Sequence, residues 1–97
     1  MKLSELNHWD VQNYLNSPDD IAAYLDAALQ EDDPDFFLVA VGDVIKALGA
    51  KRIAAQMGHG EKSLYKSIKP GAKPRYDTVF KMLHALGVRV SITATTH

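Results

Sequence analysis

Apolar residues recur at spacings of three and four along most of the chain, the pattern of helices that bury one face. Ser17-Pro18-Asp19-Asp20 is typical of a helix start, because serine caps, proline fits the first helical position and acids favour the positive helix end. The buried face that follows comprises Ile21, Tyr24, Leu25, Ala28 and Leu29. The acidic cluster 31–33 ends this helix. Residues 1–16, which carry scattered apolar residues, are predicted to form an N-terminal arm packed on the body.

Four further helices are predicted by the same reasoning. Asp33-Pro34 begins the second, and Gly49 is its expected left-handed stop. The third is predicted over about 51–57 and the fourth over about 61–68. Two prolines and a glycine in 69–74 cannot continue a helix, so the fifth begins at Asp77 or Thr78 and ends at Gly87. The sequence therefore predicts an all-α body of five helices over residues 17–87, in a single domain spanning 1–97.

Residues 88–97 have a different pattern. Apolar and polar residues alternate from Val88 to Thr95, and β-branched side chains are frequent, which predicts a C-terminal β-strand. A lone strand in a helical chain has unpaired edges. Pairing with the same strand of a second copy would satisfy them, which predicts a homodimer. Pairing with the N-terminal arm, or a strand without a partner, are the alternatives.

The composition narrows the function classes. A chain of 97 residues supports one domain with an adequate core. It has no cysteine, so disulfides and thiolate metal sites are excluded. No apolar run approaches the roughly 20 residues of a membrane span, and the N-terminus lacks the apolar core of a signal peptide. A cytoplasmic protein without a membrane partner is expected.

The charges are divided between the two halves of the chain. Residues 1–50 contain two basic and ten acidic residues, a net charge of −8, whereas residues 51–97 contain nine basic and two acidic residues, a net charge of +7. One half therefore suits a polyanion and the other a basic partner, unless both are simply solvated faces.

Residues 53–68 fit a helix-turn-helix that reads DNA. The first helix needs a small residue where it crosses the second, which is Ala54, and the turn needs a residue that tolerates positive φ, which is Gly58. Leu64 anchors the second helix one turn from its start. The remaining inward side chains are Ile53, Met57 and Ile68. A plain helical hairpin in a small core is the structural alternative.

This arrangement leaves a set of polar side chains outward at the start of the second helix, where base edges would be met. They are Glu61, Lys62, Ser63, Tyr65 and Lys66. Lys69, Lys73 and Arg75 follow in the loop and are expected to grip phosphates. The alternative for the lysines at 62 and 66 is a solvated face, and for the tyrosine a partly buried support of the helix.

Four stretches, DIAAYLDAAL, VGDVIKALGAKRIAAQMG, KSLYKSI and KPRYDTVFKMLHALGVRVSI, resemble the addiction-module antidote family, HigA-type antitoxins with a Cro/repressor-like (Xre) helix-turn-helix. The resemblance runs from about Trp9 to Ile92. It implies a small dimeric protein that binds double-stranded DNA at its own operator, represses its operon, and neutralises a cognate RelE/ParE-like toxin. The matching positions in the recognition helix and the loop after it are Ser63, Tyr65, Lys66, Lys73 and Arg75.

Two positions depart from that family pattern. Similar proteins carry a serine cap and then arginine at the start of the recognition helix, where this chain has Gly60 and Glu61. Glycine caps less well than serine, and glutamate accepts from cytosine but is repelled by phosphate. The departure keeps two other functions open, a protein-interaction module whose helix-turn-helix no longer reads DNA and an orphan phage-type repressor.

No other chemistry is predicted. The four histidines lack i,i+3 or i,i+4 pairing, so the sequence gives no support for a zinc site. Nor do we find a paired nucleophile and base, which argues against an enzyme or a cofactor site. Helix-start chemistry does not explain Glu31 and Asp32, and an acidic surface there would complement a basic ribonuclease toxin.

Overall fold

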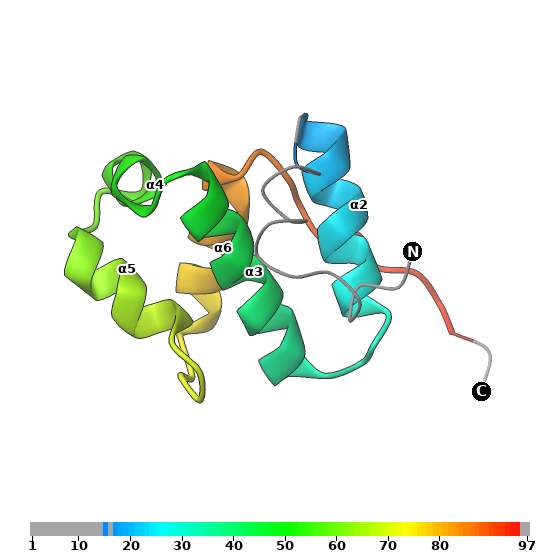
Figure 1. Cartoon of the computed structure of the whole chain (residues 1–97). Coiled ribbons are helices and arrows are strands. Elements are labelled where there is room, and N and C mark those ends of the chain that lie inside the picture. The colour runs from blue at the N-terminus through cyan, green and yellow to red at the C-terminus, as the bar shows by residue number, and fades with distance from the viewer. Residues whose placement is uncertain (1–14, 16, 96–97) are drawn as a thin grey trace.

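Five α-helices form the part of the chain that the computed structural model describes, which is residue 15 and residues 17–95. They are α2 (Pro18–Leu29), α3 (Pro34–Leu48), α4 (Ala50–Met57), α5 (Glu61–Ile68) and α6 (Tyr76–Ala85), as Figure 1 shows. All five predicted helices are confirmed. Both α4 and α6 begin slightly earlier than expected, at Ala50 and Tyr76. The arm predicted over 1–16 lies outside the described residues except for Leu15, which is buried.

The first two helices begin with the predicted capping chemistry. Ser17 Oγ accepts a hydrogen bond from the Asp20 backbone N–H at 3.2 Å. Asp33 Oδ1 accepts bonds from the backbone N–H groups of Asp35 (3.0 Å) and Phe36 (3.3 Å). Between the helices, Asp32 has φ +55°, a left-handed conformation that aspartate tolerates better than most residues. The conformation of the turn therefore explains one acid of the cluster 31–33, namely Asp32.

The third helix, α3, lies in the middle of the molecule. It packs against α2 on one side and against α4 and α5 on the other, and α4 also packs against α6. Figure 1 shows α2 at one end of the domain and α4 with α5 at the opposite end. The largest fully buried side chains come from α3, α4, α5 and α6, and are Val41, Val44, Ile45, Ile53, Leu64 and Met82. This shared core fixes the orientation of α5 relative to the rest of the body.

The C-terminal segment departs from the prediction. None of the described residues 88–95 is in a strand. A hydrogen-bonded glycine turn ends α6, with the Gly87 N–H bonded to His84 O and the Val88 N–H bonded to Leu83 O, both at 3.0 Å. Beyond it the segment runs past α2 (Figure 1). The predicted strand is therefore not found in the described single chain, because a strand needs a paired backbone, and its pairing with a second copy stays a prediction.

Burial of Tyr24 makes the stability of the fold sensitive to high pH. Desolvation of its phenol, with a smaller effect from Asp43, raises the pKa of Tyr24 from 10.0 to about 12. The phenol therefore stays neutral in the folded chain after it has begun to ionise in the unfolded chain. The contribution of the buried, neutral phenol to the free energy of unfolding is complete below pH 10 and is lost as the pH rises through 12.

We expect the urea midpoint to fall between pH 10 and pH 12, the interval between the ordinary and the raised pKa of Tyr24. The fall should be smaller in Tyr24→Phe, which cannot ionise at this position. Equal losses of stability in both proteins would contradict this assignment.

Candidate nucleic-acid interface

A tight turn over residues 58–60 joins α4 and α5. Gly58 has φ +73°, and its N–H bonds to Ala55 O at 3.2 Å, while the His59 N–H bonds to Ala54 O at 2.9 Å. These two bonds close the end of α4. An added Cβ at residue 58 would meet nothing within 4 Å, so glycine is required here by the backbone conformation and not by space. The predicted role of Gly58 is confirmed.

Two buried side chains anchor α5 on the body. Leu64 and Ile68 are buried, as is Ala54 on α4. Ile68 lies against Gly42 of α3, where an added Cβ would be 3.4 Å from Ile68 Cβ. No role was predicted for Gly42 from the sequence, although an isolated glycine within a helix is a recognised sign of close packing. The short helix is therefore held from α3 as well as from α4.

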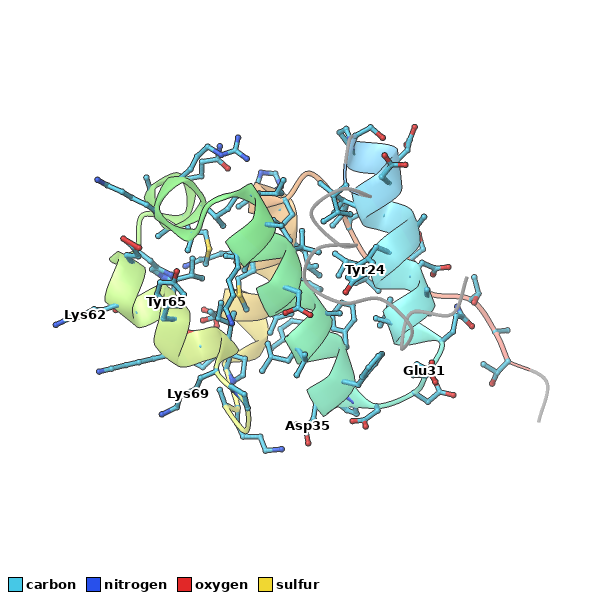
Figure 2. All side chains as sticks on the ribbon, in the orientation of Figure 1. Tyr24, Glu31, Asp35, Lys62, Tyr65 and Lys69 are labelled. Carbon is cyan, nitrogen blue, oxygen red and sulfur yellow. The ribbon has the colours of Figure 1, made fainter. Side chains whose placement is uncertain are left out.

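The outward face of α5 carries the predicted polar residues. All five of them are exposed, namely Glu61, Lys62, Ser63, Tyr65 and Lys66. Lys62 and Lys66 are four residues apart and lie opposite Leu64 and Ile68 on the helix. Figure 2 shows Lys62 pointing away from the body. The structure thus presents two ammonium groups at the centre of one exposed face.

The departure at Gly60 and Glu61 has a structural explanation. Gly60 is extended (φ −73°, ψ 152°) and gives α5 no side-chain cap. Glycine at this position costs only a few tenths of a kcal/mol relative to a good capping residue. Glu61 lies in the first turn, where a carboxylate suits the positive end of the helix. Neither residue needs a contact with DNA to account for its presence.

A shallow groove beside α5 adds a basic residue that the sequence analysis missed. The groove has a volume of about 300 Å³ and is lined by Lys46, Tyr65, Lys66, Ile68, Lys69 and Pro70, which we call the basic groove. Lys46 comes from the last turn of α3, within the acidic half of the chain. The net charge summed along the sequence did not reveal that Lys46 belongs to this groove, because only the fold brings residue 46 beside residues 66 and 69.

Lys73 and Arg75 are not part of the basic groove. The Lys73 ammonium lies 3.3 Å from Asp35 Oδ1, and Arg75 Nε lies 3.3 Å from Asp77 Oδ1. All four side chains are more than half exposed. Exposed ion pairs of this kind contribute at most about 1 kcal/mol. Both cations can therefore exchange their carboxylate for another anion at small cost.

Some of the basic and acidic residues lie at opposite ends of the domain, although Lys46 and the Lys73–Asp35 pair cross the division seen along the sequence. Figure 2 shows Lys62, Tyr65 and Lys69 at one end of the domain, and Glu31 near the opposite end beside α2.

Among the described residues, no cluster of three or more His, Asp or Glu side chains could hold a metal ion. Within the same part of the chain, no helix has the length and apolar character that crossing a membrane requires.

Comparison with known proteins identifies the family. The family model described as "Probable addiction module antidote protein" matches residues 5–94. The chain belongs to this family. A protein of Haemophilus influenzae (strain ATCC 51907 / DSM 11121 / KW20 / Rd), described as uncharacterized, is 33% identical over 88 residues, which are 91% of this chain and 91% of that protein. No solved structure gives a significant match.

Membership in the antidote family bears on several predictions. It indicates an antitoxin role, a toxin as partner, and a regulatory protein in place of an enzyme. It agrees with the resemblance found in the sequence at the level of the antidote family. The contacts of individual side chains with DNA remain predictions.

Proposed function

We propose that this antidote protein is a sequence-specific DNA-binding antitoxin that neutralises a partner toxin and represses its own operon. Its family supports the antitoxin role. The observation that carries the DNA-binding role is the outward face of α5. There, Lys62 and Lys66 lie opposite two buried anchors, on an eight-residue helix that follows a tight turn.

In this mechanism α5 enters the major groove as the second helix of a helix-turn-helix. Glu61, Lys62 and Ser63, at its N-terminal end, meet the base edges. Lysine donates to guanine O6 and N7, and glutamate accepts from the amino group of cytosine. Two copies bind as a homodimer, with α5 helices on half-sites about one turn of DNA, roughly 34 Å, apart.

The lysines of the basic groove hold the phosphate backbone beside α5. Lys46, Lys66 and Lys69 line one hollow of the surface, where their ammonium groups can contact neighbouring phosphates. Lys73 and Arg75 join them by exchanging Asp35 and Asp77 for phosphate oxygens. The exchange costs little, because the bonds given up are exposed ion pairs worth at most about 1 kcal/mol each.

The toxin, which we propose to be RelE/ParE-like, docks on the acidic end of the domain. Glu31 and Asp32 are exposed in the link between α2 and α3. A ribonuclease toxin is basic because its substrate is a polyanion, and opposite charges speed the encounter of two proteins. DNA and toxin would then meet opposite ends of the same molecule.

Neutralising this acidic end should slow toxin association. We expect Glu31→Gln with Asp32→Asn to lower the association rate several-fold at low salt, because electrostatic steering weakens. Asparagine is chosen at residue 32 because it also tolerates positive φ. Stopped-flow mixing with the toxin measures the association rate. At about 1 M salt, where charges are screened, the variant and the natural chain should associate with the toxin equally fast. An unchanged rate at low salt would remove this surface from the encounter.

A fluorescence-anisotropy titration tests the DNA-binding role. The probe is DNA from upstream of the gene, compared with scrambled DNA at several salt concentrations. We expect tighter binding to the upstream DNA, a steep salt dependence, and two protomers per site. Equal and weak binding to both DNAs would contradict the proposal.

The second candidate is a protein-interaction module that does not read DNA. It is favoured by the carboxylates that already occupy Lys73 and Arg75, and by the structural role available to Glu61. Equal binding in the titration above would support it. The antidote family disfavours an orphan phage-type repressor, and a toxin-like basic reading frame beside the gene would disfavour it further.

A further inference from the structure

The C-terminal segment, residues 88–95, leaves most of its backbone unpaired. The Val88 N–H closes the turn after α6, but no backbone group of residues 89–94 forms a hydrogen bond with another described residue. All of residues 89–95 are exposed. Apolar and polar side chains alternate along them, so the segment has the pattern of a strand and lacks only a partner backbone. An exposed, unpaired stretch of this kind is a template for pairing with another chain.

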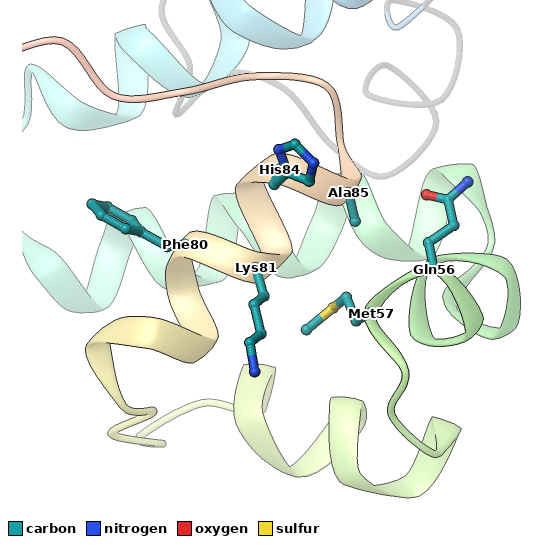
Figure 3. A pocket seen from close by; sticks show the side chains of 6 residues that line it. All are labelled: Gln56, Met57, Phe80, Lys81, His84 and Ala85. Atoms are coloured by element: carbon teal, nitrogen blue, oxygen red, sulfur yellow. The ribbon is translucent and has the colours of Figure 1, made fainter.

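A groove of about 650 Å³ lies between this segment and α2, and we call it the C-terminal groove. The segment turns back after α6 and runs beside α2 (Figure 1, Figure 3). Three exposed large apolar side chains line the groove, Leu29 from α2 and Val90 and Ile92 from the segment. Ile92 is 96% exposed, although isoleucine is among the residues most often buried. Apolar groups gathered around one groove mark an interaction surface.

The charged side chains give the C-terminal groove a negative net charge. Asp26 and Asp32 line it from α2 and the link after α2, and Arg89 is the one basic residue among those that line it. Neither carboxylate forms an ion pair with a described residue. Around them, residues 17–45 contain eight acidic residues and no lysine or arginine. The groove therefore suits a partner that is both basic and apolar.

We propose that the C-terminal groove is where the partner toxin docks, through a basic edge strand that pairs with the backbone of residues 89–94. This docking mode rests on the proposed function, because it names the surface by which the antitoxin holds its toxin. Main-chain hydrogen bonds supply affinity, and alternate apolar side chains of the toxin strand enter the groove beside Leu29 and Ile92. Basic side chains next to that strand meet Asp26 and Asp32.

The charges favour the toxin in this groove over the alternatives. The groove of about 540 Å³ between α4 and α6, which Figure 3 shows, is lined by Lys81 and His84 and by no acidic residue, so it does not attract a basic protein. A second copy of this chain would bring its own C-terminal groove to the interface. Two surfaces of negative net charge would then meet, which opposes association.

The test measures binding of the full chain to the product of the adjoining reading frame, the proposed toxin. Calorimetry gives the dissociation constants of the natural chain and of Ile92→Ser. We expect Ile92→Ser to weaken toxin binding at least about tenfold, because an apolar anchor of the interface is lost. The matched control is Val39→Ser, since Val39 is also exposed (43%) but lies on α3 and does not line the groove. It should bind the toxin normally. Thermal melts check that both variants fold.

Two proline variants test the main-chain pairing separately from the side chains. Successive N–H groups of a strand point to opposite edges, so residues 91 and 94 serve opposite edges. Ser91→Pro and Ala94→Pro each remove an N–H that bonds to no described residue. A toxin strand pairs with one edge, so one variant should weaken toxin binding at least about fivefold and the other much less.

Three results would overturn the inference. They are a folded Ile92→Ser variant that binds the toxin with an unchanged dissociation constant, an equal loss in Val39→Ser, and equal effects of the two prolines. If Ile92→Ser lowers self-association in sedimentation velocity while toxin binding is unchanged, the segment pairs with a second copy and the inference is wrong. In each case a natural chain that binds the toxin leaves the proposed function standing. A natural chain that does not bind the toxin contradicts the toxin-neutralising part of that function, and the inference with it.

Discussion

Replacing Lys62 and Lys66 with glutamine is expected to weaken binding to the upstream DNA roughly 30-fold for each bound protomer near physiological salt, if each contact contributes about 1 kcal/mol. Both side chains are exposed and four residues apart on α5, so the change removes charge from the proposed reading face without disturbing the buried anchors. The slope of log affinity against log salt should fall by about two, because each of the two bound protomers loses one phosphate-neutralising lysine, Lys66. Fluorescence anisotropy measures both quantities.

A control must separate the loss of two contacts from the change of net charge. Ala23→Glu with Ala27→Glu changes the net charge by the same amount, at exposed positions of α2. Because α2 and α5 lie at opposite ends of the domain (Figure 1), this variant should bind DNA with nearly natural affinity. If the two variants lose affinity equally, the effect is one of overall charge, and α5 is not the reading helix.

Leu64→Ala is expected to lower the free energy of unfolding by about 3 kcal/mol. Leu64 is fully buried and is one of the two anchors that hold α5 on the body. For a domain of this size, whose total stability is about 5–15 kcal/mol, such a loss is a large fraction. Urea unfolding monitored by circular dichroism measures it, and the same variant should bind DNA less well because α5 loses its fixed orientation.

Leu29→Ala provides the matched comparison. Leu29 is the last residue of α2 and is 36% exposed, so removing its side chain leaves a smaller cavity or none. We expect a loss of less than about 1 kcal/mol. Similar losses in the two variants would mean that Leu64 does not have the anchoring role assigned to it.

The sequence by itself determined the five helices and most of their ends. Ser17, Asp33 and Gly58 act through hydrogen bonds and backbone conformations within a few residues, so local chemistry was enough to locate these boundaries. It also determined which residues of α5 face outward, because burial of Leu64 and Ile68 fixes the rotation of a helix through its periodicity.

Only the tertiary structure decided which distant residues share a surface. It brought Lys46 of α3 into the basic groove and tied Lys73 to Asp35, across 38 positions of sequence. It also left residues 88–95 without a strand, because pairing depends on a neighbouring backbone that no local pattern supplies. The exposure of Tyr76 and Phe80 was likewise decided only by the tertiary structure. Periodicity assigns a residue to a face of its own helix, but whether another element covers that face depends on how the helices pack.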